Sequence, residues 1–270
     1  MEALRQIDGW PATTAAAFAV RGGGDAAAHG ERAHVFRWAS VTKLATALAA
    51  LVAAEEGVVD LDEPAGPEGS TVRHLLAHAS GLPFEPGGPT MKPAQRRVYS
   101  NVGFETLAEH VAERAEMPFS EYLAAGLLRP LGMGAELRGS AAADLHGSLD
   151  DLLALARELQ RPSLVAAETL GEAVTVQFPG LAGVLPDFGR YDPLDWGLGF
   201  ELRDEKDPHW TGSRNSPQTF GHFGGSGTFL WVDPDADVAL ACLTDRPFGD
   251  WAVEAWPRLS DSLLTEVGSQ

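Results

Sequence analysis

The chain has very few sulfhydryl and basic groups, and both shortages limit what it can be. Its single cysteine, Cys242, rules out an intrachain disulfide bond. Cys242 lies in the apolar run Val238–Leu243, which is typical of a small core residue. Only 20 Lys and Arg stand against 38 Asp and Glu, so the net charge is −18. Such an acidic chain repels polyanions, and we expect neither nucleic acid nor a membrane as a partner.

Long uncharged apolar runs are also missing. The Ala- and Leu-rich stretch after Ser40 contains Lys43 and ends in Glu55 and Glu56, so it is no membrane span. The first ten residues, MEALRQIDGW, lack the basic region and apolar run of a signal peptide. We therefore expect a cytoplasmic protein.

Patterns typical of metal and phosphate sites are absent as well. The eight histidines show no metal-ligand spacing, and no glycine cluster both follows a strand and opens a helix. The glycines at 22–24 indicate a turn instead. The sequence thus predicts no metal and no cofactor, and it carries no signal for the oligomeric state.

Strand-like segments occupy both ends of the chain and helical segments lie between them. Strands are predicted at 13–20, 26–29, 196–202, 219–222, 227–232 and 238–244. Helices are predicted at 1–9, 41–56, 72–78, 103–115, 118–126, 148–160, 166–177 and 251–267. This order favours an α+β fold, with one antiparallel sheet built from both chain ends, flanking helices and an inserted all-helical subdomain.

We expect a single catalytic domain over 1–270. Residues 1–60 and 196–270 would form its α/β part, and residues 61–195 its mainly helical part. The breaker-rich loops 84–98 and 179–195 are expected to border the cleft between them.

Ser40 is the strongest candidate for a reactive group. It precedes a long apolar helix, and Lys43 follows one turn later on the same face. Burial lowers the pKa of a lysine, which can then accept a proton from a nearby hydroxyl. The helix N-terminus also stabilises a developing anion. The pattern suits a nucleophilic serine, although S-x-x-K alone also fits a simple helix cap beside a solvated lysine.

Further motifs extend this pattern into a family resemblance. Ser40–Lys43 resembles the S-x-x-K of the serine β-lactamases and penicillin-binding proteins. Tyr99–Asn101 is similar to the Y-x-N of the class C branch, and His222–Gly224 to the H-x-G of its esterase-like members. Leu75–Pro83 resembles the family segment L-L-x-H-x-S-G-L-P. The resemblance spans residues 13 to about 265. It implies the β-lactamase-like fold and a serine hydrolase that forms an acyl-enzyme.

Catalytic roles follow from the resemblance. Ser40 would attack the acyl carbonyl, and Lys43 would take its proton. Tyr99 would be a phenolate if donors point at its oxygen, and would then exchange protons with the leaving group and water; otherwise it is a wall residue. The backbone N–H groups of Ser40 and Gly225 would form the oxyanion hole.

Substrate binding is assigned to the residues around this centre. Asn101 would hold Lys43 and a substrate oxygen, unless it only caps a helix. His222 would donate a hydrogen bond to Tyr99 or the substrate, unless it is a satisfied strand histidine. Phe223 and Gly224 complete the set.

Two departures from the lactamase pattern point to the substrate. His222 and Phe223 stand where lactamases have the lysine and threonine of K-T-G, which help to bind a carboxylate. Their loss weakens recognition of carboxylate substrates. We therefore expect a carboxylesterase acting on small neutral acyl substrates. The alternatives are a D-aminopeptidase, an amidase or a weak β-lactamase, or a non-catalytic binding or scaffold protein.

Overall fold

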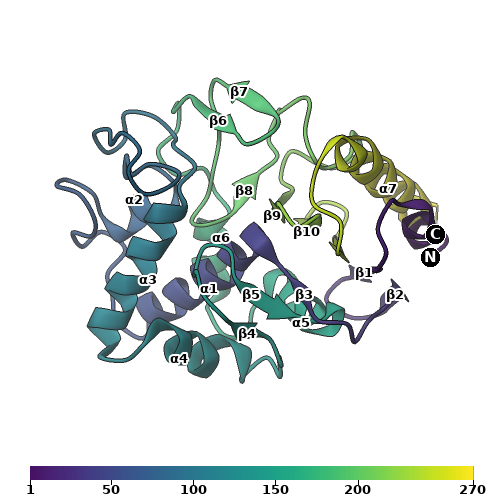
Figure 1. Cartoon of the computed structure of the whole chain (residues 1–270), viewed down its shortest axis with the longest axis horizontal. Helices are drawn as coiled ribbons and strands as arrows, with labels where there is room; N and C mark the ends of the chain where they lie inside the picture. The colour runs from purple at the N-terminus through teal and green to yellow at the C-terminus, as the bar shows by residue number, and fades with distance from the viewer. Residues whose placement is uncertain (270) are drawn as a thin grey trace.

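A six-stranded antiparallel sheet in the order β2-β1-β11-β10-β9-β8 forms the centre of the protein. The structure is a computed structural model that describes residues 1–269. The strands are β1 (Ala15–Arg21), β2 (Ala26–Gly30), β8 (Glu201–Leu202), β9 (Phe220–Gly224), β10 (Thr228–Asp233) and β11 (Val238–Thr244). β1 pairs with β11, with Ala15 opposite Thr244, so the two chain ends share one sheet (Figure 1). The predicted α+β fold is confirmed.

Helices cover both faces of this sheet, which explains why its central strands β1, β10 and β11 are buried and largely apolar. The helices concerned are η1 (Ala3–Gly9), α1 (Thr42–Glu55), α5 (Leu149–Gln160) and α7 (Asp250–Gly268). In β11, Leu240 and Cys242 pack with α7 and η1, while Ala241 and Leu243 pack with α1 and α5. Figure 1 shows α7 beside both chain termini. Cys242 is therefore a buried core thiol, as expected.

The remaining helices lie between residues 72 and 173, and three of them pack on α1. They are α2 (Val72–Leu76), α3 (Asn101–Ala115), α4 (Phe119–Leu123), the π-helical segment η3 (Ala124–Leu128) and α6 (Ala167–Ala173). α1 is buried on every side from Thr42 to Ala53, because the sheet and the helices α3 and α4 surround it. A helix buried all round must be apolar all round, so Lys43 within it is exceptional.

Short strands connect the two parts of the fold. They are β3 (Phe36–Arg37), β4 (Glu136–Leu137), β5 (Leu145–Gly147), β6 (Gly183–Leu185) and β7 (Gly189–Tyr191). The small sheet β3-β5-β4 links the segment before Ser40 to residues of the helical part. α5 also lies within 61–195 by number, yet it packs on β1, β10 and β11.

One predicted strand is wrong over most of its length. Of residues 196–202, only Glu201–Leu202 is a strand. Gly199 turns the chain with a φ of +88°, and a Cβ there would lie 2.1 Å from the Cβ of Ala47. The chain leaves the extended path at this point because its backbone packs directly against α1.

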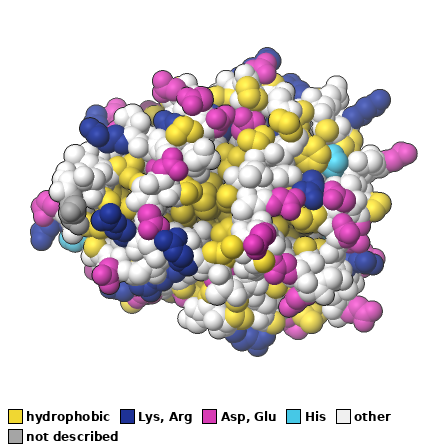
Figure 2. Space-filling model, turned by 180° about the vertical axis from the view of Figure 1, so that it is seen from behind, with side chains coloured by type: hydrophobic (Ala, Val, Ile, Leu, Met, Phe, Trp, Pro, Cys, Tyr) yellow, Lys and Arg dark blue, Asp and Glu magenta, His cyan; other side chains and the backbone are white. Residues whose placement is uncertain are grey.

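The surface carries charges of both signs. On the face drawn in Figure 2, Asp, Glu, Lys and Arg side chains are spread around the molecule, and hydrophobic side chains gather near the middle. Within residues 1–269, no helix combines the length and the apolar character needed to cross a membrane.

Candidate active site

Ser40 lies in a tight turn that the sheet holds in place. The turn is the 3-10 segment η2 (Ala39–Val41), directly before α1. Ala39 has a φ of +47°, a left-handed conformation that costs a residue with a side chain about 1–2 kcal/mol. Trp38 anchors the turn, since its carbonyl accepts a hydrogen bond of 2.8 Å from the Thr228 hydroxyl. Strain held this way by its surroundings is typical of a functional site.

Lys43 is completely buried beside Ser40. Its Nζ donates hydrogen bonds to Asn101 Oδ1 at 2.7 Å and to the carbonyl of Ala142 at 2.9 Å. The same nitrogen lies 3.4 Å from Ser40 Oγ. The structure thus brings together the two residues of the S-x-x-K pattern and Asn101, which is distant in sequence.

Burial also sets the protonation of this lysine. Desolvation lowers the pKa of Lys43 to about 7, against the opposing effect of the Glu105 and Glu85 carboxylates. Near neutral pH a large fraction of Lys43 is therefore a free amine. A free amine within reach of Ser40 can accept the hydroxyl proton.

Tyr99 faces Ser40 but is not a phenolate. Burial raises its pKa, an effect that its hydrogen bond with Ser40 only partly opposes. Lys43 Nζ lies over the ring, 4.8 Å from its centroid, and does not donate to the phenolic oxygen. The condition stated for a phenolate is therefore not met in this structure. A neutral phenol is suited to give a proton rather than to take one.

His78 supports Tyr99 from below. Its Nδ1 accepts a hydrogen bond of 3.1 Å from the backbone N–H of Ser100, and its ring centroid lies 4.7 Å from that of Tyr99. Ser100 in turn caps α3 by accepting from the N–H of Gly103. The Y-x-N segment is therefore held at both its backbone and its aromatic ring.

Asn101 has both ends of its amide occupied. Oδ1 accepts from Lys43, and Nδ2 donates to Glu85 Oε1 at 2.7 Å. A substrate oxygen would have to displace Glu85 to reach this amide. Glu85 was missed by the sequence reasoning because it belongs to no motif, and only the loop 84–98 brings it here.

His222 lines the site as a neutral acceptor. Its Nδ1 lies 2.6 Å from the carbonyl of Phe223, so this nitrogen carries the proton and donates it. Nε2 then has a lone pair and no hydrogen-bond partner among residues 1–269. Desolvation lowers the pKa of His222 to about 3. The expected hydrogen bond from His222 to Tyr99 or the substrate is therefore wrong, because its only proton is already used.

Gly224 and Gly225 have different surroundings. A Cβ on Gly224 would lie 2.5 Å from the Trp38 carbonyl, so this glycine lets β9 pack against the turn that carries Ser40. Gly224 does not line the cavity, contrary to its predicted role in substrate binding. Gly225 has open space in front of it, and its N–H makes no hydrogen bond within the described residues. An unpaired N–H at the cavity wall suits an oxyanion hole.

These groups surround a cavity of about 130 Å³. It is lined by Ser40, Phe84, Tyr99, Leu185, Pro186, Asp187, His222, Phe223 and Gly225. Both loops expected to border the cleft contribute residues to it. Asp187, at the tip of the β6–β7 hairpin, was not predicted, because nothing in its local sequence marks it.

Comparisons with known proteins agree with this fold. The family model described as Beta-lactamase matches residues 6–135 and 133–264. The crystal structure of a beta-lactamase from Mycobacterium bovis is 52% identical, covers 98% of this chain and 99% of its own, and has a TM-score of 0.96. A hydrolase with promiscuous acyltransferase activity, EstCE1, shares the fold at 17% identity, with 97% of each chain covered and a TM-score of 0.77.

Curated relatives are more distant. The D-alanyl-D-alanine-carboxypeptidase/endopeptidase AmpH of Escherichia coli is 29% identical over 136 residues, which are 37% of this chain and 35% of that protein. A Salmonella enteritidis protein, provisionally named a D-alanyl-D-alanine carboxypeptidase, is 22% identical over 256 residues and 69% of this chain. This chain spans only 59% of the length of that relative.

Proposed function

Since the chain belongs to the Beta-lactamase family of serine hydrolases, we propose that it is a carboxylesterase that hydrolyses small neutral esters through an acyl-enzyme on Ser40. The observation that carries this proposal is the lining of the cavity around Ser40. Phe223 offers an aromatic face, His222 a neutral imidazole and Asp187 a carboxylate. A substrate carboxylate would lose its water there without gaining a cation.

Acylation uses the groups that surround Ser40. The free amine of Lys43 takes the hydroxyl proton as Ser40 Oγ bonds to the ester carbonyl carbon. The N–H groups of Ser40 and Gly225 stabilise the oxyanion. As the bond to the alcohol breaks, the Lys43 ammonium gives its proton to the leaving oxygen, which the neutral Tyr99 phenol stabilises by donating a hydrogen bond.

Deacylation reverses these roles. Lys43 is a free amine again, and it takes one proton from the attacking water, which the neutral Tyr99 phenol holds in position by a hydrogen bond. The water oxygen bonds to the acyl carbon, the bond to Ser40 breaks, and the proton returns to Ser40. The acid is released, and every proton is accounted for within Ser40 and Lys43.

Competing substrates test the substrate class directly. We expect kcat/KM for p-nitrophenyl acetate to exceed that for nitrocefin by about 10²-fold or more, since nitrocefin carries a carboxylate. The double variant Phe223→Thr with His222→Lys should narrow this gap. If the unmodified protein turns over both substrates equally well, the esterase assignment is wrong and the protein is a lactamase or peptidase. A fluorophosphonate probe that leaves Ser40 unlabelled would show a non-catalytic binding protein.

Asp187 favours a second candidate, hydrolysis of amino-acid esters or amides that carry a free amino group. Its exposed side chain lines the cavity next to Ser40 and forms no ion pair with any of residues 1–269. If this candidate holds, Asp187→Asn lowers kcat/KM for alanine p-nitroanilide several-fold more than for p-nitrophenyl acetate. If Asp187→Asn changes kcat/KM equally for both substrates, Asp187 does not recognise an amino group, and neutral esters remain the proposed substrates.

A further inference from the structure

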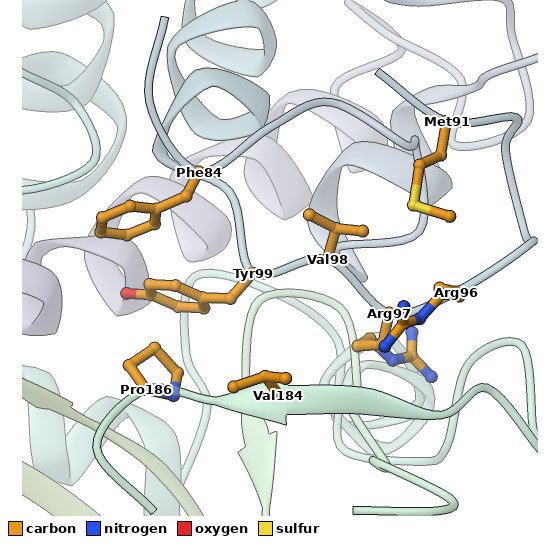
Figure 3. A pocket seen from close by; sticks show the side chains of 8 residues that line it. All are labelled: Phe84, Met91, Arg96, Arg97, Val98, Tyr99, Val184 and Pro186. Carbon is orange, nitrogen blue, oxygen red and sulfur yellow. The ribbon is translucent and has the colours of Figure 1, made fainter. Parts of the chain in front are cut away.

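A second and larger hollow adjoins the cavity around Ser40. It has a volume of about 390 Å³ and shares Phe84, Tyr99 and Pro186 with the cavity around Ser40. Its other lining residues are Met91, Arg96, Arg97, Val98 and Val184. In Figure 3 the rings of Phe84 and Tyr99 lie at one end, Met91 and the two arginines lie toward the other, and Val184 and Pro186 form the opposite wall. We refer to these eight residues as the apolar groove.

The walls of the groove are tied together by the backbone. The N–H of Arg97 donates to the carbonyl of Ala182 at 3.0 Å, which joins the loop 84–98 to the β6–β7 hairpin. A Cβ on Gly183 would lie 2.5 Å from the Arg97 carbonyl, so this close contact requires glycine. The N–H of Asn101 also donates to the carbonyl of Phe84 at 3.0 Å. The groove is therefore formed before any substrate binds.

Its far end is closed by a residue that is not free to pair with a ligand. Arg97 is only 2% exposed, and its guanidinium donates to the carbonyls of Leu194, Ala77 and Gln177 at 2.6–3.0 Å. The Arg97 guanidinium therefore stabilises the fold and is not available to bind a ligand. Along the rest of the groove, the side chains offered to a ligand are apolar or aromatic, apart from the exposed Arg96 at the rim.

Two of its residues are unusually exposed for their type. Phe84 is 48% exposed and Val184 is 50% exposed, and both face the same groove. Phe84 stacks on Tyr99 with ring centroids 5.7 Å apart. Contiguous exposed apolar surface that joins a catalytic cavity marks a binding site rather than ordinary surface.

We propose that this groove binds a linear apolar chain of the substrate, so that the protein prefers esters with a medium-length hydrocarbon chain over acetates. The inference rests on the proposed esterase function and names its substrate class. The groove shares Phe84, Tyr99 and Pro186 with the Ser40 cavity, and this adjacency determines the occupant, because a chain bonded to the reacting carbonyl would reach the groove past these residues. The closed end at Arg97 limits how much of the chain the groove can hold.

Chain-length series test the proposal. Removing one methylene fully from water strengthens binding about fourfold. Because this groove is open along one side, we expect kcat/KM to rise only about twofold per methylene. Over the six methylenes from p-nitrophenyl acetate to the octanoate, kcat/KM should rise roughly 60-fold, and it should level off for longer chains. A parallel series of acetate esters with lengthening alcohols shows whether the groove takes the acyl or the alcohol side.

Matched variants localise the effect. Val184→Asp and Met91→Gln should each lower the ratio of octanoate to acetate hydrolysis at least fivefold. Val35→Asp is the control, since Val35 is also 50% exposed but lies outside the groove, and its ratio should equal that of the unmodified protein. Circular dichroism of each variant verifies folding.

The outcomes separate this inference from the function on which it rests. If short esters are hydrolysed but both chain-length series are flat, or if the groove variants leave the ratio unchanged, the groove does not bind the substrate chain. If no ester of any length is hydrolysed, the proposed esterase function itself is wrong.

Discussion

Glu85 is expected to control the pH at which this protein becomes active. Its carboxylate is joined to Lys43 through Asn101, by hydrogen bonds of 2.7 Å on each side of the amide. Its negative charge raises the pKa of Lys43, while burial lowers that pKa to about 7. Glu85→Gln keeps an oxygen for Asn101 Nδ2 but removes the charge. The pKa of Lys43 must then fall, and the free amine must be available at lower pH.

The size of the shift follows from the separation of the charges. Two hydrogen bonds and one amide place the charges about 7 Å apart, which is worth about 2 kcal/mol at an effective dielectric constant of 20 and about 0.6 kcal/mol in water. Glu85 is exposed, so the true value lies toward the lower figure. We expect the pKa of Lys43 to fall by about 0.5–1 unit.

The assay is the pH dependence of kcat/KM for p-nitrophenyl acetate between pH 5 and 9. The unmodified protein should gain activity as the pH rises through about 7, where Lys43 loses its proton. In Glu85→Gln this rise in activity should occur at lower pH. The control is Glu168→Gln, at an exposed position on α6, and it should leave the pH of the rise unchanged. If the rise in kcat/KM of Glu85→Gln stays at the same pH or moves to higher pH, Lys43 is not the titrating base.

Three further variants probe the site. Ser40→Ala should fold normally and lose about 10⁴-fold or more in kcat, and mass spectrometry of the unmodified protein should place the acyl adduct on the peptide with Ser40; an adduct on another serine would refute the assignment. Tyr99→Phe should slow turnover more than acylation, measured as burst against steady-state rates, and an unchanged steady-state rate would mean that another group activates water. Gly224→Ala should cost about 1–3 kcal/mol of stability, because its Cβ would meet the Trp38 carbonyl and Thr228 Oγ1 at 2.5 Å; an unchanged melting temperature would contradict that packing.

Local patterns in the sequence were enough for much of the fold. The caps Thr71 and Ser148 predicted where two helices begin, because a side chain that accepts from a helix N–H acts within three residues. The apolar run Val238–Leu243 predicted a buried strand. Ser40 and Lys43 could be paired from sequence, because one helical turn separates them.

Other features depend on contacts between distant residues. The strand predicted at 196–202 is broken at Gly199 by close packing against α1, which no local pattern reveals. The proton of His222 is on Nδ1 because the backbone places the Phe223 carbonyl beside it. The pKa of Lys43 depends on how deeply α1 is buried, which the helix sequence alone does not state.

The sequence by itself was enough to propose the chemistry of this protein, and the tertiary structure was needed to propose what that chemistry acts on. The proposed nucleophile and base lie one turn apart, Ser40 in η2 and Lys43 at the start of α1, so the chain's local geometry specifies their proximity. Glu85, Asp187 and the apolar groove come from loops whose conformations depend on long-range contacts, such as the hydrogen bond from Arg97 to Ala182. We expect substrate specificity to reside in these loops, which only folding brings to Ser40.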